Sequence, residues 1–490
     1  MPINQFDPKF DSLLEGLQGN ILKSHGRDHT ANVFVTFDDG QVSGARNWIR
    51  NFALTSLTSA RQQLAEIDNF KRHKVPGGIF FGLYVTSFAY DYFKIPPEMR
   101  PIESAGAFKG GMRNAQLNDI VSDWDPHFRG ENIHLMVLVG HDDKEVLSKE
   151  VAKLIETIRE FTIDPELPEN SSEWFASSRI NIEYGNAIRN ANGDGLEHFG
   201  YVDGISQPLF FDDEFKLANE NSVPFTGDQL MWDPRAELEL VLTADHSSAK
   251  TFGSFYVFRK LEQDVRRFKL AERQLANFIG LDEKDAELAG AMIVGRFEDG
   301  TPVTLLADDG MPGAGNANNF NYAGDTDGLK CPFHSHIRKT NPRGSGGSPE
   351  GVPFDPKQSL EFDKTVIMAR RGIPYGQREV STQFDCQPEQ FPTGSGIGLL
   401  FQSFQSDIAK QFEFIQKSWA NNSSFPFSNP AGNSGIDPIV GQSIKPADRE
   451  YNWPSGHGLP GASARSFNSF VTMRGGEYFF APSLTTLSTF

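Results

Sequence analysis

Hydrophobic residues in the first half of the chain follow two periodicities, and each indicates one type of element. Short apolar runs rich in β-branched and aromatic residues predict four strands, at Val33–Phe37, Ile79–Tyr84, Ile133–Val139 and about Arg179–Glu183. Apolar positions spaced three or four residues apart predict helices around Trp48–Phe70 and Lys144–Phe161. The order β-α-β-β-α-β is that of the ferredoxin-like motif, an antiparallel sheet with helices on one face.

The second half repeats this order, although no residue-level repeat accompanies it. Strands are predicted at Ser254–Phe258, Val366–Arg370, Gly398–Phe404 and Tyr478–Phe480, and helical patterns at Leu261–Ile279, Glu283–Ala291 and Asp407–Ala420. We therefore expect an α+β protein of two tandem ferredoxin-like domains, residues 1–210 and 225–490, joined by a linker near 208–225. Segments 307–322 and 341–358 are rich in Gly, Asn, Pro or Ser and are predicted to be long surface loops.

Composition narrows the possible partners of the chain. The 490 residues carry a formal net charge of -18, and Lys and Arg form no long basic run, so neither nucleic acid nor anionic lipid is an expected partner. No apolar stretch approaches the roughly 18 residues of a membrane span. Two cysteines, Cys331 and Cys386, exclude a disulfide scaffold and allow at most one bridge.

The segment from His198 to Pro208 is dense in turn formers and holds Asp203 between two glycines. Asp-Gly is a common turn pair, and the Asp in such a turn usually bonds its own backbone. Taken alone, this segment favours a structural turn over a catalytic acid.

Two histidines and three basic residues lie together between Cys331 and Arg343. An imidazole can ligate haem iron, and nearby guanidinium groups can pair with the porphyrin propionates. A zinc site would need further Cys or His ligands at suitable spacing, and none is evident nearby. A basic surface loop is equally compatible with this composition.

Arg370 and Arg371 follow the apolar run 366–369, which places them at the end of a predicted buried strand. A buried arginine needs an anion. That anion is either a structural carboxylate or negative charge that develops during a reaction. The pattern alone favours the structural pair.

Taken together, these segments resemble the dye-decolorising peroxidase family, whose hallmark Gly-x-x-Asp-Gly is present as Gly200–Gly204. Further matching segments follow in the family's order, at 331–333, 336–338, 370–376, 398–401, 417–419 and 435–438. The chain length, the start Leu17–Leu22 and the long loops are most similar to the large fungal members. The resemblance implies two ferredoxin-like halves with one haem b per chain in the C-terminal half.

The resemblance also implies roles for individual residues. His336 would be the proximal iron ligand, and Asp203 and Arg370 would form the distal pair that handles hydrogen peroxide. The family's motif spacing selects His336 over His334 and Arg370 over its neighbour Arg371.

Supporting roles follow from the same resemblance. Asp437 would accept a hydrogen bond from the other ring nitrogen of His336 and make that ligand more basic. Arg338 is the candidate partner of a haem propionate. Leu399 and Phe401 would wall the distal pocket and keep it too narrow for a dye.

Bulky donors would then be oxidised at the surface, through side chains that form radicals. Tyr375 and Trp419 are similar to family positions proposed for this electron relay. For Trp419 the apolar face of its predicted helix equally favours core packing.

The resulting hypothesis is a haem peroxidase that reduces hydrogen peroxide and oxidises dyes and phenolic compounds one electron at a time. The alternative is a haem carrier of chlorite dismutase-like fold without peroxidase turnover. The resemblance favours an extracellular enzyme, and sequons at Asn170, Asn421 and Asn422 are compatible with export, although the printed N-terminus lacks the features of a signal peptide. Monomer and homodimer both stay open.

Overall fold

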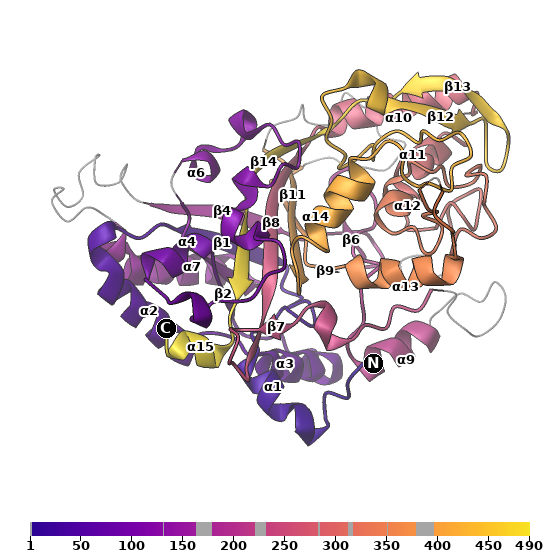
Figure 1. The fold of residues 1–490 in the computed structure, drawn as a ribbon. Helices are drawn as coiled ribbons and strands as arrows, with labels where there is room; N and C mark the ends of the chain where they lie inside the picture. Colours follow the sequence, from indigo (N-terminus) through magenta and orange to yellow (C-terminus); the bar gives the residue numbers. More distant parts are fainter. Residues whose placement is uncertain are drawn as a thin grey trace.

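Ten strands of the computed structural model form one antiparallel sheet that runs through the molecule (Figure 1). The structure describes residues 2–130, 132–162, 179–220, 232–282, 285–311, 317–349, 351–378 and 396–490. Cys386 and Asn170 lie outside the described residues. None of the helices within these ranges is both long and apolar enough to cross a membrane.

The N-terminal half of the sheet has the strand order β2-β3-β1-β4. Its strands are β1 His29–Val35, β2 Phe80–Val85, β3 Leu135–His141 and β4 Ile180–Asn186, and its main helices are α2 Val42–Thr55, α3 Ala60–His73 and α7 Lys144–Ile158. The prediction of a single helix over Trp48–Phe70 is wrong, because helix α2 ends at Thr55 and a second helix, α3, follows. Ser59 starts the second helix, and its hydroxyl accepts a hydrogen bond from the Gln62 amide.

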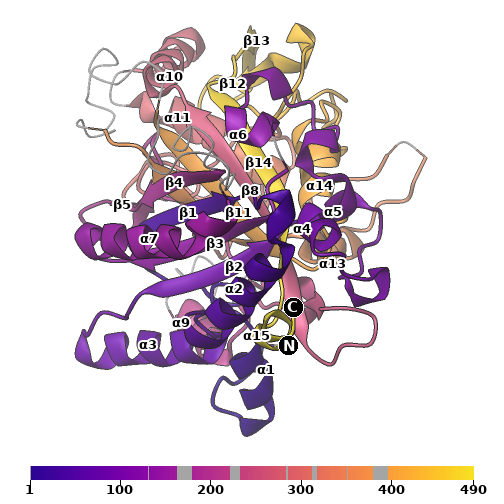
Figure 2. The same cartoon turned by 90° about the vertical axis from the view of Figure 1, so that its left-hand side faces the viewer.

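The C-terminal half repeats the order as β10-β11-β8-β14, so each half has the ferredoxin-like arrangement that the sequence predicts. Its strands are β8 Phe252–Gln263, β9 Ala369–Arg370, β10 Ile373–Tyr375, β11 Gly398–Gln405 and β14 Val471–Ala481. The two halves join edge to edge where Phe480 of β14 pairs with Val85 of β2. Figure 2 shows the strands of both halves side by side.

Helices of the C-terminal half begin later than their patterns predict. They are α10 Val265–Ile279, α11 Glu287–Val294, α12 His336–Thr340, α13 Pro356–Val366 and α14 Phe412–Phe414, which continues as a π-helical segment, Ile415–Ala420. Residues 261–263, predicted as helix, extend strand β8 instead. The predicted strand 366–370 starts only at Ala369, because Val366 ends α13.

The segment near 208–225, predicted as a linker, is folded against the start of the chain. Its described part contains helix α9, Asp212–Glu220. The amide of Ile3 donates to the carbonyl of Phe210, and the amide of Asp212 donates to the carbonyl of Ile3.

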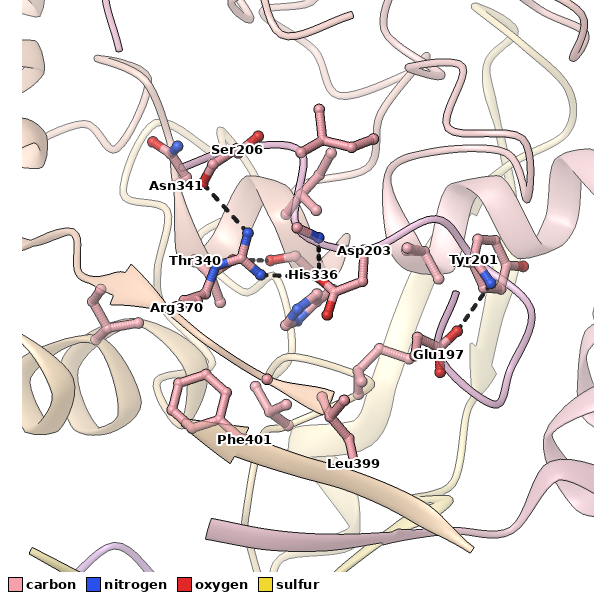
Figure 3. Close-up of a pocket in the computed structure, with 18 of the residues that line it drawn as sticks. Glu197, Tyr201, Asp203, Ser206, His336, Thr340, Asn341, Arg370, Leu399 and Phe401 are labelled. Carbon is pink, nitrogen blue, oxygen red and sulfur yellow. Dashed lines mark hydrogen bonds and ion pairs between the residues drawn. The ribbon is translucent and has the colours of Figure 1, made fainter. Parts of the chain in front are cut away.

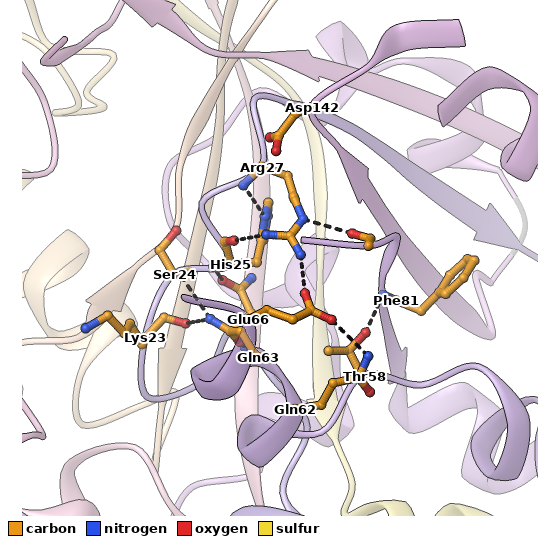
Figure 4. A network of polar contacts seen from close by, with 12 residues as sticks. Lys23, Ser24, His25, Arg27, Thr58, Gln62, Gln63, Glu66, Phe81 and Asp142 are labelled. Atoms are coloured by element: carbon orange, nitrogen blue, oxygen red, sulfur yellow. Dashed lines mark hydrogen bonds and ion pairs between the residues drawn. The ribbon is translucent and has the colours of Figure 1, made fainter. Parts of the chain in front are cut away.

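Polar contacts hold the N-terminal segment against helix α3 (Figure 4). The Gln63 side-chain amide donates to the backbone carbonyls of Lys23 and Ser24. Arg27 pairs with Glu66 on the same helix. These contacts hold the segment Asn20–Arg27 in place. Its carbonyls of Asn20 and Ile21 accept hydrogen bonds from Arg371 of the C-terminal half.

Candidate active site

A cavity of about 260 Å³ lies where the loop after β6 (Gly195–Leu196) meets helix α12 and strands β9 and β11 (Figure 3). Five residues proposed from the sequence line it: Asp203, His336, Arg370, Leu399 and Phe401. They come from four separate segments of the chain, and the fold brings them together.

His336 begins helix α12 and is held from behind by a buried carboxylate. Its Nδ1 lies 2.8 Å from Oδ2 of Asp437, which leaves Nε2 as the ring nitrogen available to the cavity. The other oxygen of Asp437 accepts hydrogen bonds from the amides of Ile439 and Val440. Burial opposes a charge on His336, but Asp437 outweighs that effect and raises the pKa of the ring.

His334, two residues earlier, takes no part in the cavity lining. Its ring packs against Tyr451 and Trp453, with centroid distances of 4.6 and 4.4 Å. Burial lowers the pKa of His334 to about 3. The structure thus separates the two histidines into a cavity side chain and a core side chain.

Asp203 and Arg370 form an ion pair inside the cavity. Arg370 Nη1 lies 3.2 Å from Asp203 Oδ1, and the second guanidinium nitrogen donates to the carbonyl of Ser206 at 3.3 Å. The amide of Gly204 also donates to Asp203 Oδ1, at 2.6 Å. Each side chain of the pair is about one third exposed, with 34 % for Asp203 and 32 % for Arg370.

Partly buried polar contacts shape the loop that carries Asp203. The Glu197 carboxylate accepts hydrogen bonds from the amides of Phe199 and Tyr201, at 2.8 and 3.0 Å. Gly200 and Gly204 have φ angles of 109° and 82°, which side chains with a Cβ rarely adopt. The two glycines of the Gly-x-x-Asp-Gly motif therefore allow the backbone conformation of the loop, and the Asp side chain between them faces the cavity.

Arg371 points away from this cavity and binds the N-terminal segment. Its Nε donates to the carbonyl of Asn20 at 2.7 Å, and its Nη2 donates to the carbonyl of Ile21 at 2.8 Å. It is the structural arginine of the pair, and Arg370 is the one that lines the cavity.

Arg338, predicted to contact a propionate, is not in the cavity. It is 1 % exposed, and its guanidinium donates to Oδ2 of Asp325 at 2.9 Å and to the carbonyl of Cys331 at 2.6 Å. Tyr322 and Phe333 lie against its guanidinium, with ring centroids at 4.5 and 4.4 Å. The charge of Arg338 is already compensated in the core by Asp325. This contradicts the predicted pairing of Arg338 with a haem propionate.

Two other arginines line the cavity: Arg343, from the basic segment 331–343, and Arg296, which no sequence motif indicates. Both donate to neutral oxygen atoms and have no carboxylate partner among the described residues. Within those residues Nη2 of Arg296 is buried without any hydrogen-bond partner. Burial, with the nearby charges of Arg343 and Arg370, lowers the pKa of Arg296 to about 9.

This excess of positive charge fits a ligand with carboxylates. Arg259 also lines the cavity, but Asp119 neutralises it at 2.7 and 2.8 Å. The unpaired cations Arg296 and Arg343 together with the imidazole of His336 match haem, which has two propionates and an iron that accepts nitrogen. The residues present therefore fit that cofactor.

Comparison with known proteins gives the family. The multifunctional dye peroxidase DyP2 of Amycolatopsis sp. is 38% identical over 481 residues, which cover 97% of this chain and 95% of that protein. The chain belongs to the dye-decolorising peroxidase family. It is therefore a peroxidase, and the family implies a haem cofactor. No family model matches the chain.

Other family members support the same conclusion. The crystal structure of an Anabaena sp. DyP-type peroxidase has a TM-score of 0.85 at 36% identity and covers 100% of this chain and 97% of its own. The dye-decolorizing peroxidase AauDyP1 of Auricularia auricula-judae, a fungal enzyme, is 31% identical over 76% of this chain and 68% of its own. The bacterial DyP2 thus matches more of the chain than this fungal member, whereas length and loops had suggested fungal members.

The walls of the peroxidase cavity are apolar on the β11 side. Leu399 and Phe401 are two residues apart on this strand and therefore point to the same face. Phe412 and Ile415 extend this apolar wall from the neighbouring helical segment.

The two predicted relay residues of the peroxidase are buried instead of lying at the surface. Tyr375 is 5 % exposed and Trp419 is 4 % exposed, and neither lines the cavity. The Trp419 ring stacks on Phe425 at 5.2 Å, as the core interpretation of its helical face predicts. A dye cannot reach either ring directly, so oxidation of a dye by contact with these side chains is contradicted, whereas their part in an electron relay stays a prediction.

Proposed function

We propose that the chain binds one haem b, reduces hydrogen peroxide with it, and oxidises aromatic dyes and phenolic compounds in one-electron steps. One observation carries the proposal. The His336–Asp437 pair and the Asp203–Arg370 pair come from distant segments and meet at one cavity, which also holds the unpaired cations Arg296 and Arg343. Because the chain belongs to a family of peroxidases, an enzyme is favoured over the alternative of a haem carrier without turnover.

The proximal contribution comes from His336. Its Nε2 would hold the iron, while Asp437 fixes the ring and makes it a stronger electron donor. Arg296 and Arg343 would pair with the propionates. When bound, haem would supply a redox-active iron that accepts two oxidising equivalents from peroxide and passes them one at a time to electron donors.

The distal contribution comes from Asp203 and Arg370. Peroxide must lose a proton from one oxygen and gain one on the other, and a single carboxylate within reach of both can move it. Asp203 is therefore the proton-transferring group at its carboxylate. Arg370 is always cationic, so it stabilises the negative charge that develops on the departing oxygen.

The hydrogen bonds of this pair keep it oriented. Gly204 and Arg370 both donate to Oδ1 of Asp203, so Oδ2 is the oxygen left to exchange a proton. Leu399 and Phe401 form an apolar wall beside it, which leaves room for a small molecule and keeps out bulky donors.

An absorption spectrum tests cofactor and reaction together. The purified chain, loaded with haem, is recorded before and after one equivalent of hydrogen peroxide and again after an aromatic dye is added. We expect a histidine-ligated ferric spectrum, a rapid change with peroxide, and recovery with dye. A bound haem that does not react with peroxide would refute the proposal.

A further inference from the structure

Tyr201 is the second residue of the Gly200–Gly204 motif, and the sequence analysis gave it no role. It lines the cavity, and its backbone amide is held by Glu197 (Figure 3). Its phenol donates a hydrogen bond to Oε1 of Glu272 at 2.5 Å, and both side chains are buried. A tyrosine at the cofactor cavity thus has a carboxylate in place as a proton acceptor.

Glu272 belongs to a buried network of charges. Its other oxygen, Oε2, lies 3.0 Å from Nζ of Lys269, and this lysine also pairs with Glu298. Nζ of Lys269 lies 5.2 Å from the centroid of the Tyr201 ring. The lysine compensates the Glu272 carboxylate, and the remaining oxygen is held in position to accept the phenolic proton.

Gly290 shows that this contact is built closely into the fold. It lies inside helix α11, where glycine costs about 1 kcal/mol relative to alanine. A Cβ added there would lie 1.9 Å from Glu272 Oε1 and 2.1 Å from the Tyr201 hydroxyl. Only glycine at this position leaves room for the Tyr201–Glu272 hydrogen bond.

On the basis of the proposed function, we propose that Tyr201 is a redox-active side chain of this peroxidase. It gives one electron to the peroxide-oxidised haem and passes its phenolic proton along the existing hydrogen bond to Glu272. The haem is reduced by one electron, and a neutral phenoxyl radical faces a protonated Glu272. An aromatic donor outside the cavity then returns one electron by transfer through the protein to the buried ring, and the proton moves back from Glu272 to Tyr201.

Tyr322 offers a matched comparison in the same cavity. It also lines the cavity and is buried, but its hydroxyl has no hydrogen-bond partner within the described part of the chain. Oxidation of Tyr322 would leave its proton without an acceptor. Both tyrosines line the cavity, but only the hydroxyl of Tyr201 has a proton acceptor. We therefore expect different redox behaviour for the two side chains.

The test traps radicals in the haem-loaded enzyme. Wild type, Tyr201→Phe and Tyr322→Phe are mixed with one equivalent of hydrogen peroxide without donor, freeze-quenched and examined by electron paramagnetic resonance. A parallel sample receives a nitroso spin trap, and the adduct is located by peptide mass spectrometry. We expect a tyrosyl signal and an adduct on Tyr201, both lost in Tyr201→Phe and both kept in Tyr322→Phe.

A second variant tests the proton acceptor and covers any failure of Tyr201→Phe to fold. Glu272→Gln keeps the Tyr201 ring but cannot take its proton, so we expect a weaker radical signal and less adduct on Tyr201. Haem absorption and thermal unfolding verify that each variant is folded and loaded. An undiminished signal in either Tyr201→Phe or Glu272→Gln, or an adduct on Tyr322, would overturn the role of Tyr201.

Failure of this inference differs from failure of the proposed function. A wild-type haem spectrum that does not change with peroxide would overturn both. A normal spectral change without a radical on Tyr201 overturns only the inference.

Discussion

The two halves of the sheet share one strand order but differ in what connects their strands. In the N-terminal half, the main helices α2 and α3 join β1 to β2. In the C-terminal half, the connection from β8 to β9 spans 264–368 and carries α10, α11, α12 and α13. This long connection brings His336 to the cavity. Among the described residues, the N-terminal half reaches the cavity through the loop that follows its last strands and carries Asp203. The shared topology supplies the platform, and the unequal connections supply the chemistry.

Removing the imidazole at the cavity should have the largest effect. In His336→Ala the long connection keeps its fold but loses the iron ligand, so we expect loss of the histidine-ligated haem spectrum and of dye oxidation. Absorption spectroscopy of the haem-loaded variant measures this. Added imidazole should restore part of the spectrum.

His334→Ala is the matched control from the same segment. It removes a ring from the core against Tyr451 and Trp453, so thermal stability should fall while the haem spectrum stays that of wild type. The reverse outcome, a lost spectrum in His334→Ala and a kept one in His336→Ala, would exchange the two roles.

Asp203, in the loop between the halves, is the group proposed to transfer the proton of peroxide. Asp203→Asn keeps the size and can still accept from Arg370, but it cannot take a proton. We expect the reaction with peroxide to slow by about 10²-fold or more, measured by stopped-flow absorption. Asp212→Asn, an acid of helix α9 outside the cavity, should react at the wild-type rate. A fast Asp203→Asn variant would leave Arg370 as the main distal group.

Two arginines of one segment should differ in the property that they affect. Arg343→Ala removes an uncompensated cation from the cavity and should weaken haem retention by roughly 10- to 100-fold, the value of a charge-assisted hydrogen bond. Arg338→Ala leaves Asp325 buried and unpaired, so unfolding should become easier by about 3–5 kcal/mol. Haem transfer to an acceptor protein and denaturant unfolding separate the effects, and similar haem loss in both variants would contradict the separation.

The sequence predicted much of the fold because the strands are apolar runs with strong local signals. Strand β11 was predicted almost to the residue, since it begins at a glycine, Gly398, which is followed by the apolar run Leu399–Phe401. The break between α2 and α3 was missed, because Ser56 to Ser59 contains no Gly or Pro and the apolar period continues across it. Helix starts beside β8 were misplaced because a buried strand and a buried helix are both apolar.

The site was predictable as a set of motifs but not as a geometry. Motif spacing distinguished His336 from His334, and the structure places only His336 in the cavity. Nothing local distinguishes Arg338 from Arg343, because their difference is the position of Asp325, which lies on a separate turn. The contact between Tyr201 and Glu272 joins residues 71 positions apart, so it required the structure.

Buried ionisable groups should give the two halves pH dependences of opposite sign. In the N-terminal half, burial lowers the pKa of His134 to about 4, from an ordinary value of 6.5. The unfolded chain therefore binds the extra proton first, and His134 costs stability as the pH falls from 6.5 towards 4. In the C-terminal half, burial raises the pKa of Asp363 to about 7, so this group costs stability as the pH rises towards 7.

Paired isosteric variants isolate these small contributions from the other titrating groups. The melting temperature of His134→Asn minus that of wild type should rise as the pH is lowered from 6.5 to 4. The same difference for Asp363→Asn should rise as the pH is raised from 4 to 7, because asparagine can still accept from the Gly344 amide without ionising. Parallel curves for the two buried variants would mean that His134 and Asp363 keep ordinary pKa values, because only shifted values of opposite direction make the curves diverge.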